Sequence, residues 1–312
     1  MINFHPVGIE DKDKINEFFL TNSYRNCDFS FSNILCWKHK YDTTFAIIDG
    51  FLLFRFFAAH NEPGYMMPLG AGNLNKAIDL LRTDAKERGD HFYLFAITQE
   101  MFAHIEAACP GKLKFETDRA WSEYIYDAQD LITLKGKKFQ SKRNHVNRFK
   151  KTYDYEYLPI TREIIPDCLI LYYQWCKENG GCNEDTSLIE ERHATQKAFH
   201  YFEQLGLKGG AIRVAGKIVA YSYGQQLTSD TFGIHAEKSL YEIDGGFSAI
   251  NQMFAEHECQ NYKYINREED LGIESLRKSK ESYHPVMLLK KGYVEEKDFD
   301  EIAHLTKLIS TK

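Results

Sequence analysis

The stretch "GGAIRVAGKIVAYSYGQQL", residues 209–227, decides the fold of the second half of this chain. Two runs rich in β-branched and aromatic residues meet at Ala215-Gly216, a pattern typical of an antiparallel hairpin. A turn at Ser229-Asp230 leads into a third run, "TFGIHAE" (231–237). These residues predict an antiparallel meander of three strands.

Helices and further strands are predicted on both sides of this meander. Thr161 to Glu178 and Leu188 to Leu205 carry apolar residues at helical spacing before it. After it, Asp244-Gly245-Gly246 opens a helix that runs to about Glu258. The runs "YKYINR" (262–267) and "VMLLKKGYVEE" (286–296) follow as strands.

The first half has the same order of elements. A helix at Ile9–Leu20 precedes "TTFAIIDGFLLFRFF" (43–57), a hairpin in which Asp49-Gly50 supplies the two positive φ angles of a tight turn. A third strand near "YMMPLG", a helix from Asn75 to Arg88 and the strand "HFYLFAIT" (91–98) follow. Each half thus predicts an α+β fold, a mixed and mostly antiparallel sheet flanked by helices, in the order expected of the acyltransferase fold.

Composition indicates a globular, two-domain chain. It has 312 residues, 43% hydrophobic and 14% aromatic, and a net charge of −6. The N-terminus lacks a signal-peptide pattern, and no apolar run reaches about 20 residues, so we expect a cytoplasmic protein without a transmembrane segment. The seven cysteines are scattered and match no zinc module, which predicts buried thiols in a reducing compartment.

The junction between the halves is strongly basic. "KGKKFQSKRNHVNRFKK", residues 135–151, contains eight Lys or Arg and no acid. Its apolar residues have helical spacing, so we expect a helix with one packed face and one cationic face. We therefore divide the chain into an N-terminal domain (1–134), a basic interdomain helix (135–152) and a C-terminal domain that carries the active site (153–312).

The segment "NREEDLGIESLRKSKESYHP", 266–285, concentrates charged residues after a strand. An acid such as Asp270 at a strand end can serve as a general base, and cations such as Arg277 and Lys278 can stabilise a developing oxyanion. The alternative interpretation is a solvated helix with spaced ion pairs such as Glu274 with Lys278.

A second polar segment is "HAEKSLYEIDGGFSAINQ", 235–252. Glu237 near the end of its strand is a candidate base. Gly245 and Gly246 at the helix start, with Asn251 on the helix, are candidates for binding a phosphate-bearing cofactor, although such a glycine pair is also common in plain turns.

The remaining patterns exclude several classes of chemistry. The histidines have no metal-ligand spacing, so we predict no metal site, and the chain contains no Walker loop, GxGxxG or G-x-S-x-G. A metal-free group transfer fits better than hydrolysis or redox chemistry.

Several motifs together resemble a known family. "LKGKKFQSKRNHVNRF", "NREEDLG", "LRKSKESYHP", "WSEYIYDAQDL" and "IHAEK…GGFSAINQ" are similar to the soluble branch of the phosphatidylglycerol lysyltransferase C-terminal domain family, from about "FSNILCWKHKY" onward. The resemblance implies two tandem GNAT-like domains, also similar to Fem-type aminoacyltransferases. Glu237 corresponds in position to the strand-end acid of that family, but Lys238 follows it where the lipid enzymes have Leu.

Three functions remain open at this point. The first is an aminoacyltransferase that moves an amino acid from aminoacyl-tRNA to an amine or hydroxyl of a small molecule, lipid headgroup or peptide, with Lys142, Arg143 and Arg148 on the tRNA acceptor stem. The second is an N-acyltransferase that uses a CoA thioester. The third is a non-enzymatic binding protein whose acidic and basic strips pair with each other.

Overall fold

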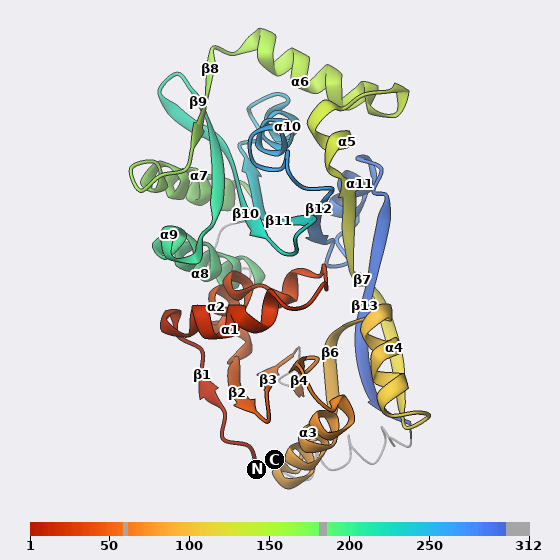
Figure 1. The fold of residues 1–312 in the computed structure, drawn as a ribbon. Coiled ribbons are helices and arrows are strands. Elements are labelled where there is room, and N and C mark those ends of the chain that lie inside the picture. Colours follow the sequence, from red (N-terminus) through yellow and green to blue (C-terminus); the bar gives the residue numbers. More distant parts are fainter. Residues whose placement is uncertain (59–61, 181–185, 298–312) are drawn as a thin grey trace. The chain divides into compact units, whose positions relative to one another are not determined.

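The computed structural model describes residues 1–58, 62–180 and 186–297, drawn as a ribbon in Figure 1. The chain forms two compact units, which are described separately. The first comprises Met1–Asn22, Lys38–Ser122 and the chain from Lys290 onward, and the second comprises Ser23–Trp37 and Glu123–Leu289.

These units do not follow the boundaries predicted at residues 134 and 152. The last described strand, β13 (Met287–Glu296), pairs antiparallel with β6 (Tyr93–Thr98) over Lys291–Glu295. Because hydrogen bonds and packing bind that strand to the first unit, the end of the predicted C-terminal domain belongs to the first unit instead.

In the first unit, hydrogen-bonded strands follow the order β1-β2-β3-β4-β6-β13, and β5 pairs with β3. The predicted hairpin is confirmed: β2 and β3 pair antiparallel, and Asp49 and Gly50 have φ of 50° and 79°. The elements are β1 (His5–Pro6), η1 (Ile9–Asp11), α1 (Lys12–Phe19), β2 (Thr44–Ile48), β3 (Phe51–Phe57), β4 (Pro63–Tyr65), β5 (Leu69–Gly70), α3 (Leu74–Arg88), β6 and α4 (Gln99–Ala108). Two elements besides β13 have residues in both units, α2 (Phe31–Tyr41) and β7 (Leu113–Asp127).

In the second unit the strand order is β7-β12-β11-β10-β9-β8. The pairs are antiparallel except β11 with β12, which are parallel. The elements are η2 (Cys27–Phe29), α5 (Ala128–Thr133), η4 (Lys137–Phe139), α6 (Gln140–Thr152), β8 (Tyr155–Pro159), α7 (Ile165–Glu178), α8 (Thr186–His200), α9 (Phe202–Leu205), β9 (Lys208–Val214), β10 (Lys217–Gln226), β11 (Thr231–Ser239), α10 (Gly246–Glu258), β12 (Tyr264–Glu269) and α11 (Glu274–Glu281).

The meander predicted over residues 209–237 is confirmed as β9, β10 and β11. Its first turn has Ala215 and Gly216 at φ of 48° and 79°, as a tight hairpin requires. Two helix predictions differ at their ends. The helix predicted from Thr161 begins at Ile165, because Pro166 favours the first helical turn. The helix predicted at 188–205 is two helices with a break at Tyr201.

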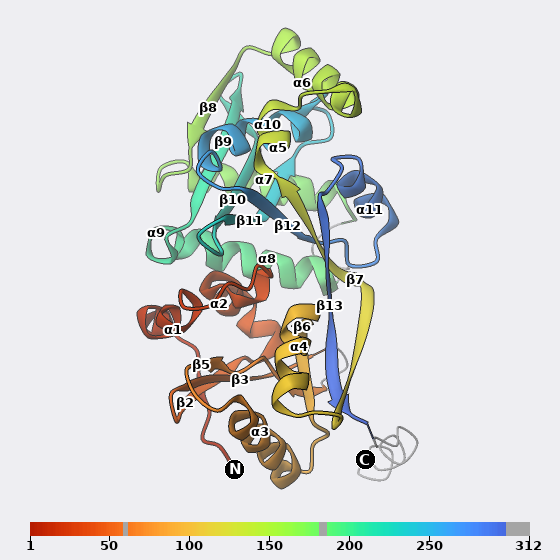
Figure 2. The ribbon, with the colours of Figure 1, turned by 45° about the vertical axis from the view of Figure 1, so that its right-hand side comes forward.

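Helices cover the meander through alternating residues of its strands. Ala249, Ile250 and Met253 of α10 pack with Ile212 and Ala220. Phe199 of α8 instead contacts Tyr221 and Tyr223, at ring-centroid distances of 5.5 and 5.3 Å. Because successive side chains of a strand point to opposite faces, both faces of β10 are buried. Figures 1 and 2 show α10 and the helices α7 and α8 around these strands.

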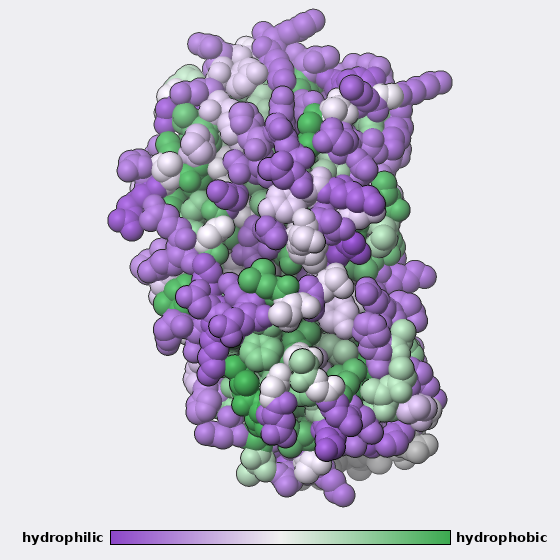
Figure 3. Space-filling view, in the orientation of Figure 1, coloured by the Kyte–Doolittle hydropathy of each residue, from purple (hydrophilic) through white to green (hydrophobic). Residues whose placement is uncertain are grey.

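The basic segment lies within the second unit. The buried side chains of Phe139 and Val146 join one core cluster, and Phe149 joins the cluster that contains the α10 residues. Helices α6 and α10 contact each other directly. In the region of α6, the space-filling view in Figure 3 is largely hydrophilic.

The cysteine prediction holds in part. Cys27, Cys36, Cys109, Cys168 and Cys259 are buried thiols outside any disulfide, whereas Cys176 is disulfide-bonded. The seventh, Cys182, lies outside the described residues. Among the described residues, no helix has both the length and the apolar character that crossing a membrane requires.

Candidate active site in the second unit

Glu237 of β11 and Arg267 of β12 form a buried ion pair. The parallel pairing of these strands runs from Thr231 with Tyr264 to Gly233 with Asn266, and both charged residues lie just beyond its end. Arg267 Nη2 donates to Glu237 Oε1 at 2.9 Å, and the two side chains are only 10% and 11% exposed. The carboxyl ends of neighbouring parallel strands are a common place for ligand binding.

Helix α10 supplies the second partner of this carboxylate. Asn251 is completely buried, and its Nδ2 donates to Glu237 Oε2 at 2.9 Å. Both oxygens of Glu237 are therefore held by donors from different elements, which fixes the direction of the side chain. The sequence prediction placed Glu237 and Asn251 in separate roles, and the structure brings them into contact.

Aromatic rings enclose the arginine. The Arg267 guanidinium carbon lies 4.8 Å from the ring centre of Tyr283 and 5.5 Å from that of Tyr126. Burial acts to lower the pKa of Arg267, but the Glu237 carboxylate and the Tyr126 hydroxyl raise it above its usual value. The guanidinium therefore stays charged in this water-poor site.

Lys142 reaches the same place from α6. Its Nζ lies 4.0 Å from the ring centre of Tyr283. Burial and the nearby Arg267 lower the pKa of Lys142 to about 8, while Glu237 opposes the shift. This ammonium lies beside the ion pair, and the predicted contact of Lys142 with the tRNA acceptor stem stays a prediction. At this pKa the group can exchange a proton near neutral pH.

Two polar atoms of the site keep unused hydrogen-bonding capacity. Within the described part of the chain, Arg267 Nη1 and Asn251 Oδ1 are buried and have no hydrogen-bond partner. Most buried polar atoms in proteins are paired, so this donor and this acceptor beside the same carboxylate are available to bind water or a polar ligand. We call the set Glu237, Arg267, Asn251, Lys142 and Tyr283 the Glu237 site.

The glycine pair opens α10 as predicted. Gly245 has a φ of 78°, and a side chain there would approach within 2.5 Å of the main-chain oxygen of His145 on α6. The glycine is therefore required for the close packing of α6 on the start of α10. At the same end, the carboxylate of Asp244 accepts from Arg148 at 2.6 Å, so an acid of the chain itself already lies beside this helix terminus. Phosphate binding by Gly245 and Gly246 stays a prediction.

The structure gives Asp270 a structural set of partners. The buried carboxylate accepts from Tyr124 Oη at 2.6 Å, Gly272 N at 2.8 Å and twice from Arg277, at 2.8 and 3.0 Å. Arg277 lowers the pKa of Asp270 far below its usual value, more than burial raises it. A carboxylate that accepts four hydrogen bonds and has such a low pKa is a poor proton acceptor. This arrangement therefore does not favour Asp270 as the base.

The other predicted cations have different surroundings. Lys278 pairs with Glu274 at 2.6 Å, and both side chains are largely exposed, as the solvated-helix interpretation proposed. Arg143 donates to the main-chain oxygens of Leu134 and Gly136, the latter at 2.7 Å. Because these bonds hold the loop before α6, Arg143 has a structural role, while Arg148 is more than half exposed.

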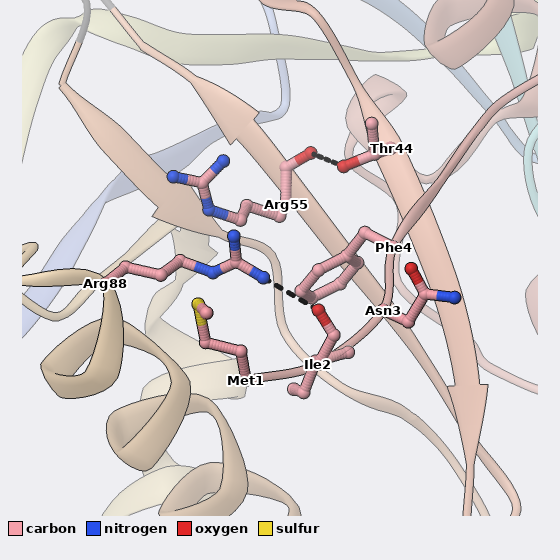
Figure 4. Close-up of a pocket in the computed structure, with 7 residues that line it drawn as sticks. All are labelled: Met1, Ile2, Asn3, Phe4, Thr44, Arg55 and Arg88. Carbon is pink, nitrogen blue, oxygen red and sulfur yellow. Dashed lines mark hydrogen bonds between the residues drawn. The ribbon is translucent and has the colours of Figure 1, made fainter.

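A cavity of about 440 Å³ lies in the first unit and contains none of the predicted site residues. Figure 4 shows Arg55 and Arg88 converging beside Phe4 and the first residues of the chain. Both arginines have partners: Arg55 donates to Asp90 at 2.9 Å, and Arg88 donates to Asp84 and to the Ile2 carbonyl, each at 2.7 Å. We assign no role in transfer to this cavity.

A group of potential metal ligands occurs in the second unit, although the sequence spacing predicted none. Cys27, Asp28, Glu123 and Glu269 present ligand atoms within 4.8 Å of one another. The buried ammonium of Lys280 lies nearby. Burial and the charge of Arg267 lower its pKa to about 8, although Glu268 and Glu269 oppose this shift. A cation of the chain thus already offsets part of the negative charge, and we assign no metal to the group.

The fold is GNAT-like, a mixed sheet flanked by helices, and comparison with known proteins identifies the family. The family described as phosphatidylglycerol lysyltransferase, C-terminal, matches residues 22–294, and the chain belongs to it. A conserved protein of unknown function from Bacteroides thetaiotaomicron is 47% identical in sequence, with a TM-score of 0.90 over 95% of this chain and 100% of that one.

More distant matches show the fold alone. L-PGS from Bacillus licheniformis is 17% identical, with a TM-score of 0.67 over 99% of this chain and 98% of that one. FemX is 8% identical, with a TM-score of 0.64 over 99% and 100%. A tandem GNAT protein from the clavulanic acid biosynthesis pathway is 7% identical, with a TM-score of 0.50 over 96% and 99%. The predicted fold class is confirmed.

An uncharacterized protein of Mycoplasmoides gallisepticum is 28% identical over 179 residues. This match spans 56% of the chain and 56% of that relative, so the chain covers about half the length of the curated protein that it matches.

Proposed function

We propose that the chain is an aminoacyltransferase that moves an amino acid from aminoacyl-tRNA to an acceptor amine or hydroxyl, and that the Glu237 site carries the reaction. The single observation that supports this most is the buried Glu237–Arg267 pair, beside which Arg267 Nη1 and Asn251 Oδ1 have no partner among the described residues. Membership of the phosphatidylglycerol lysyltransferase family supports the reaction class.

The proposed chemistry needs no cofactor, because an aminoacyl ester is already activated. The acceptor amine or hydroxyl attacks the ester carbonyl and gives its proton to Glu237, which Arg267 and Asn251 hold in place. Arg267 Nη1 and the Lys142 ammonium stabilise the oxyanion that forms. Lys142 then passes its proton to the departing ribose oxygen. A pKa near 8 suits this step, since the group is charged at neutral pH but releases its proton readily.

We place the tRNA along the exposed side of α6. Arg148 stands on that side, more than half exposed, close to the start of α10. Its guanidinium and the ammonium groups of neighbouring lysines would contact backbone phosphates. These contacts would position the ester independently of the tRNA sequence. The acceptor is a small molecule, lipid headgroup or peptide that bears an amine or hydroxyl.

A donor screen tests the proposed function. The purified protein is incubated with a pool of tRNAs charged with radiolabelled amino acids, and separately with radiolabelled acetyl-CoA, each with an extract that supplies acceptors. We expect label to move from tRNA to an acid-soluble or lipid product. Transfer from acetyl-CoA alone would establish the N-acyltransferase alternative, and no transfer from either donor would favour the binding-protein alternative.

A further inference from the structure

A second set of side chains in the same unit has the arrangement of a nucleophile, a base and an orienting acid. Ser32 of α2 lies with its Oγ 3.1 Å from Nε2 of His235 on β11. The other ring nitrogen of His235, Nδ1, is 2.8 Å from Oε1 of Glu268 on β12. These residues are about 200 and 30 positions apart in sequence, so no short motif reveals them.

The hydrogen bonds fix the direction in which protons can move. A carboxylate can only accept, so the proton on the imidazole is at Nδ1, where it is donated to Glu268. Nε2 of the neutral ring is then an acceptor, and the Ser32 hydroxyl donates to it. This is the tautomer in which histidine can take the proton of a serine as its oxygen attacks a carbonyl carbon.

Irregularities of two neighbouring strands aim the base and the acid. In the pairing of β10 with β11, the adjacent residues Tyr223 and Gly224 face Ala236 and Ile234, which leaves His235 as the extra residue of a bulge. In β12 the register shifts between Asn266 and Glu269, and Glu268 has a φ of 57°, in the left-handed region that a non-glycine residue seldom adopts. Bulges and strained residues are frequent at active sites, where they redirect side chains.

The surroundings suit a serine whose attack on a carbonyl carbon places negative charge on the carbonyl oxygen. Ser32 stands in the first turn of the eleven-residue helix α2, where the positive end of the helix dipole and main-chain N–H groups favour an oxyanion. Ser32 is 3% exposed, and the His235 side chain is 6% exposed. Such shielding from water strengthens the electrostatic interactions within the group.

We propose that Ser32 is an activated nucleophile that takes an acyl group from a small activated carboxylic ester, giving the chain a hydrolytic activity in addition to the proposed transfer. Ser32 Oγ bonds to the carbonyl carbon while its proton passes to His235 Nε2. The bond to the leaving alcohol breaks, and the alcohol takes that proton. Water then attacks the acyl-serine and gives a proton to Nε2, the carboxylic acid leaves, and Ser32 regains its proton.

A fluorophosphonate probe tests the proposal on the full folded chain, because such probes react with activated serines. We expect one label per chain at Ser32, located by mass spectrometry of the peptide that contains it. With p-nitrophenyl acetate we expect a burst of nitrophenol equal to the protein concentration. His235→Gln should lower the labelling rate at least about 100-fold, and Glu268→Gln should lower it less.

Ser30→Ala provides the matched control. Ser30 is also buried at the start of α2, but its hydroxyl donates to the Cys27 carbonyl at 2.9 Å, away from His235. The Ser30→Ala variant should be labelled at Ser32 at the same rate as the wild type. No label at Ser32 in the folded wild type, or equal labelling in folded His235→Gln, would show that the three residues only tie α2 to the sheet. The experiment uses no tRNA, so its outcome is independent of the proposed transfer.

Discussion

Asn251 and Glu237 meet at 2.9 Å, although one stands on α10 and the other on β11. The amide donates one proton to the carboxylate while its own oxygen has no partner within the described ranges. Removing this amide should therefore leave a buried carboxylate with one donor fewer. We expect Asn251→Ala to lower the free energy of unfolding by about 1–3 kcal/mol, measured by urea denaturation. A free energy equal to that of the wild type would show that Glu237 does not depend on the amide.

Lys142 should set the alkaline limit of transfer. Burial lowers its pKa to about 8, so the ammonium that protonates the leaving oxygen is lost as the pH rises through that value. We expect the single-turnover rate of the wild type to fall above about pH 8. In Lys142→Arg the charge persists, because arginine does not titrate in this range, but the proton is not released. The rate should then be low, and its fall near pH 8 should disappear. A fall that persists in the variant would assign the titration to another group.

The Arg277–Asp270 pair should contribute to stability in a pH-dependent way. Arg277 holds the pKa of Asp270 far below its usual value in the folded chain, whereas in the unfolded chain the carboxyl titrates near pH 4. The stabilisation is therefore complete above about pH 4 and is lost as the pH falls toward the folded-state pKa. We expect Arg277→Gln to have a lower melting temperature than the wild type at pH 7 and a smaller difference at pH 3. A constant difference would contradict the ionised pair.

Arg148 should contact RNA if the donor is tRNA. Its side chain is more than half exposed on α6, so its removal leaves the cores of the unit unchanged. We expect Arg148→Gln to weaken tRNA binding and to reduce the slope of log affinity against log salt by about 0.9. Lys217→Gln, at the exposed first residue of β10, is the charge-matched control and should bind like the wild type. Equal slopes for both variants would show that Arg148 of α6 does not contact the tRNA.

Much of the fold could be predicted from local sequence. The Asp49-Gly50 and Ala215-Gly216 turns have the positive φ angles that the sequence indicated, and α10 begins at the predicted glycine pair. Helices α2 and α4 were missed. The first turn of α2 contains no acid, and α4 is a short helix that follows β6 without a break. The position of β13 depended on long-range pairing with β6, which no local pattern shows.

The site could be predicted only in part, because its contacts also depend on long-range pairing. Glu237 and Asn251 were chosen as single residues, but their contact with each other and with Arg267 depends on the parallel pairing of β11 and β12 around α10. Lys142 was assigned to RNA from the charge of its segment, and its direction became evident only from the packing of α6. The contacts among Ser32, His235 and Glu268 depend on two bulges that no sequence pattern predicts.

The most direct test of the proposed function is the single-turnover loss of a radiolabelled amino acid from tRNA in the presence of acceptor. Wild type, Glu237→Gln and Glu242→Gln are compared, the last a matched change at an exposed acid on the loop after β11. We predict that Glu237→Gln lowers the rate at least about 100-fold, with unchanged tRNA affinity, while Glu242→Gln transfers like the wild type. Transfer by folded Glu237→Gln at the wild-type rate would contradict the assignment of this site.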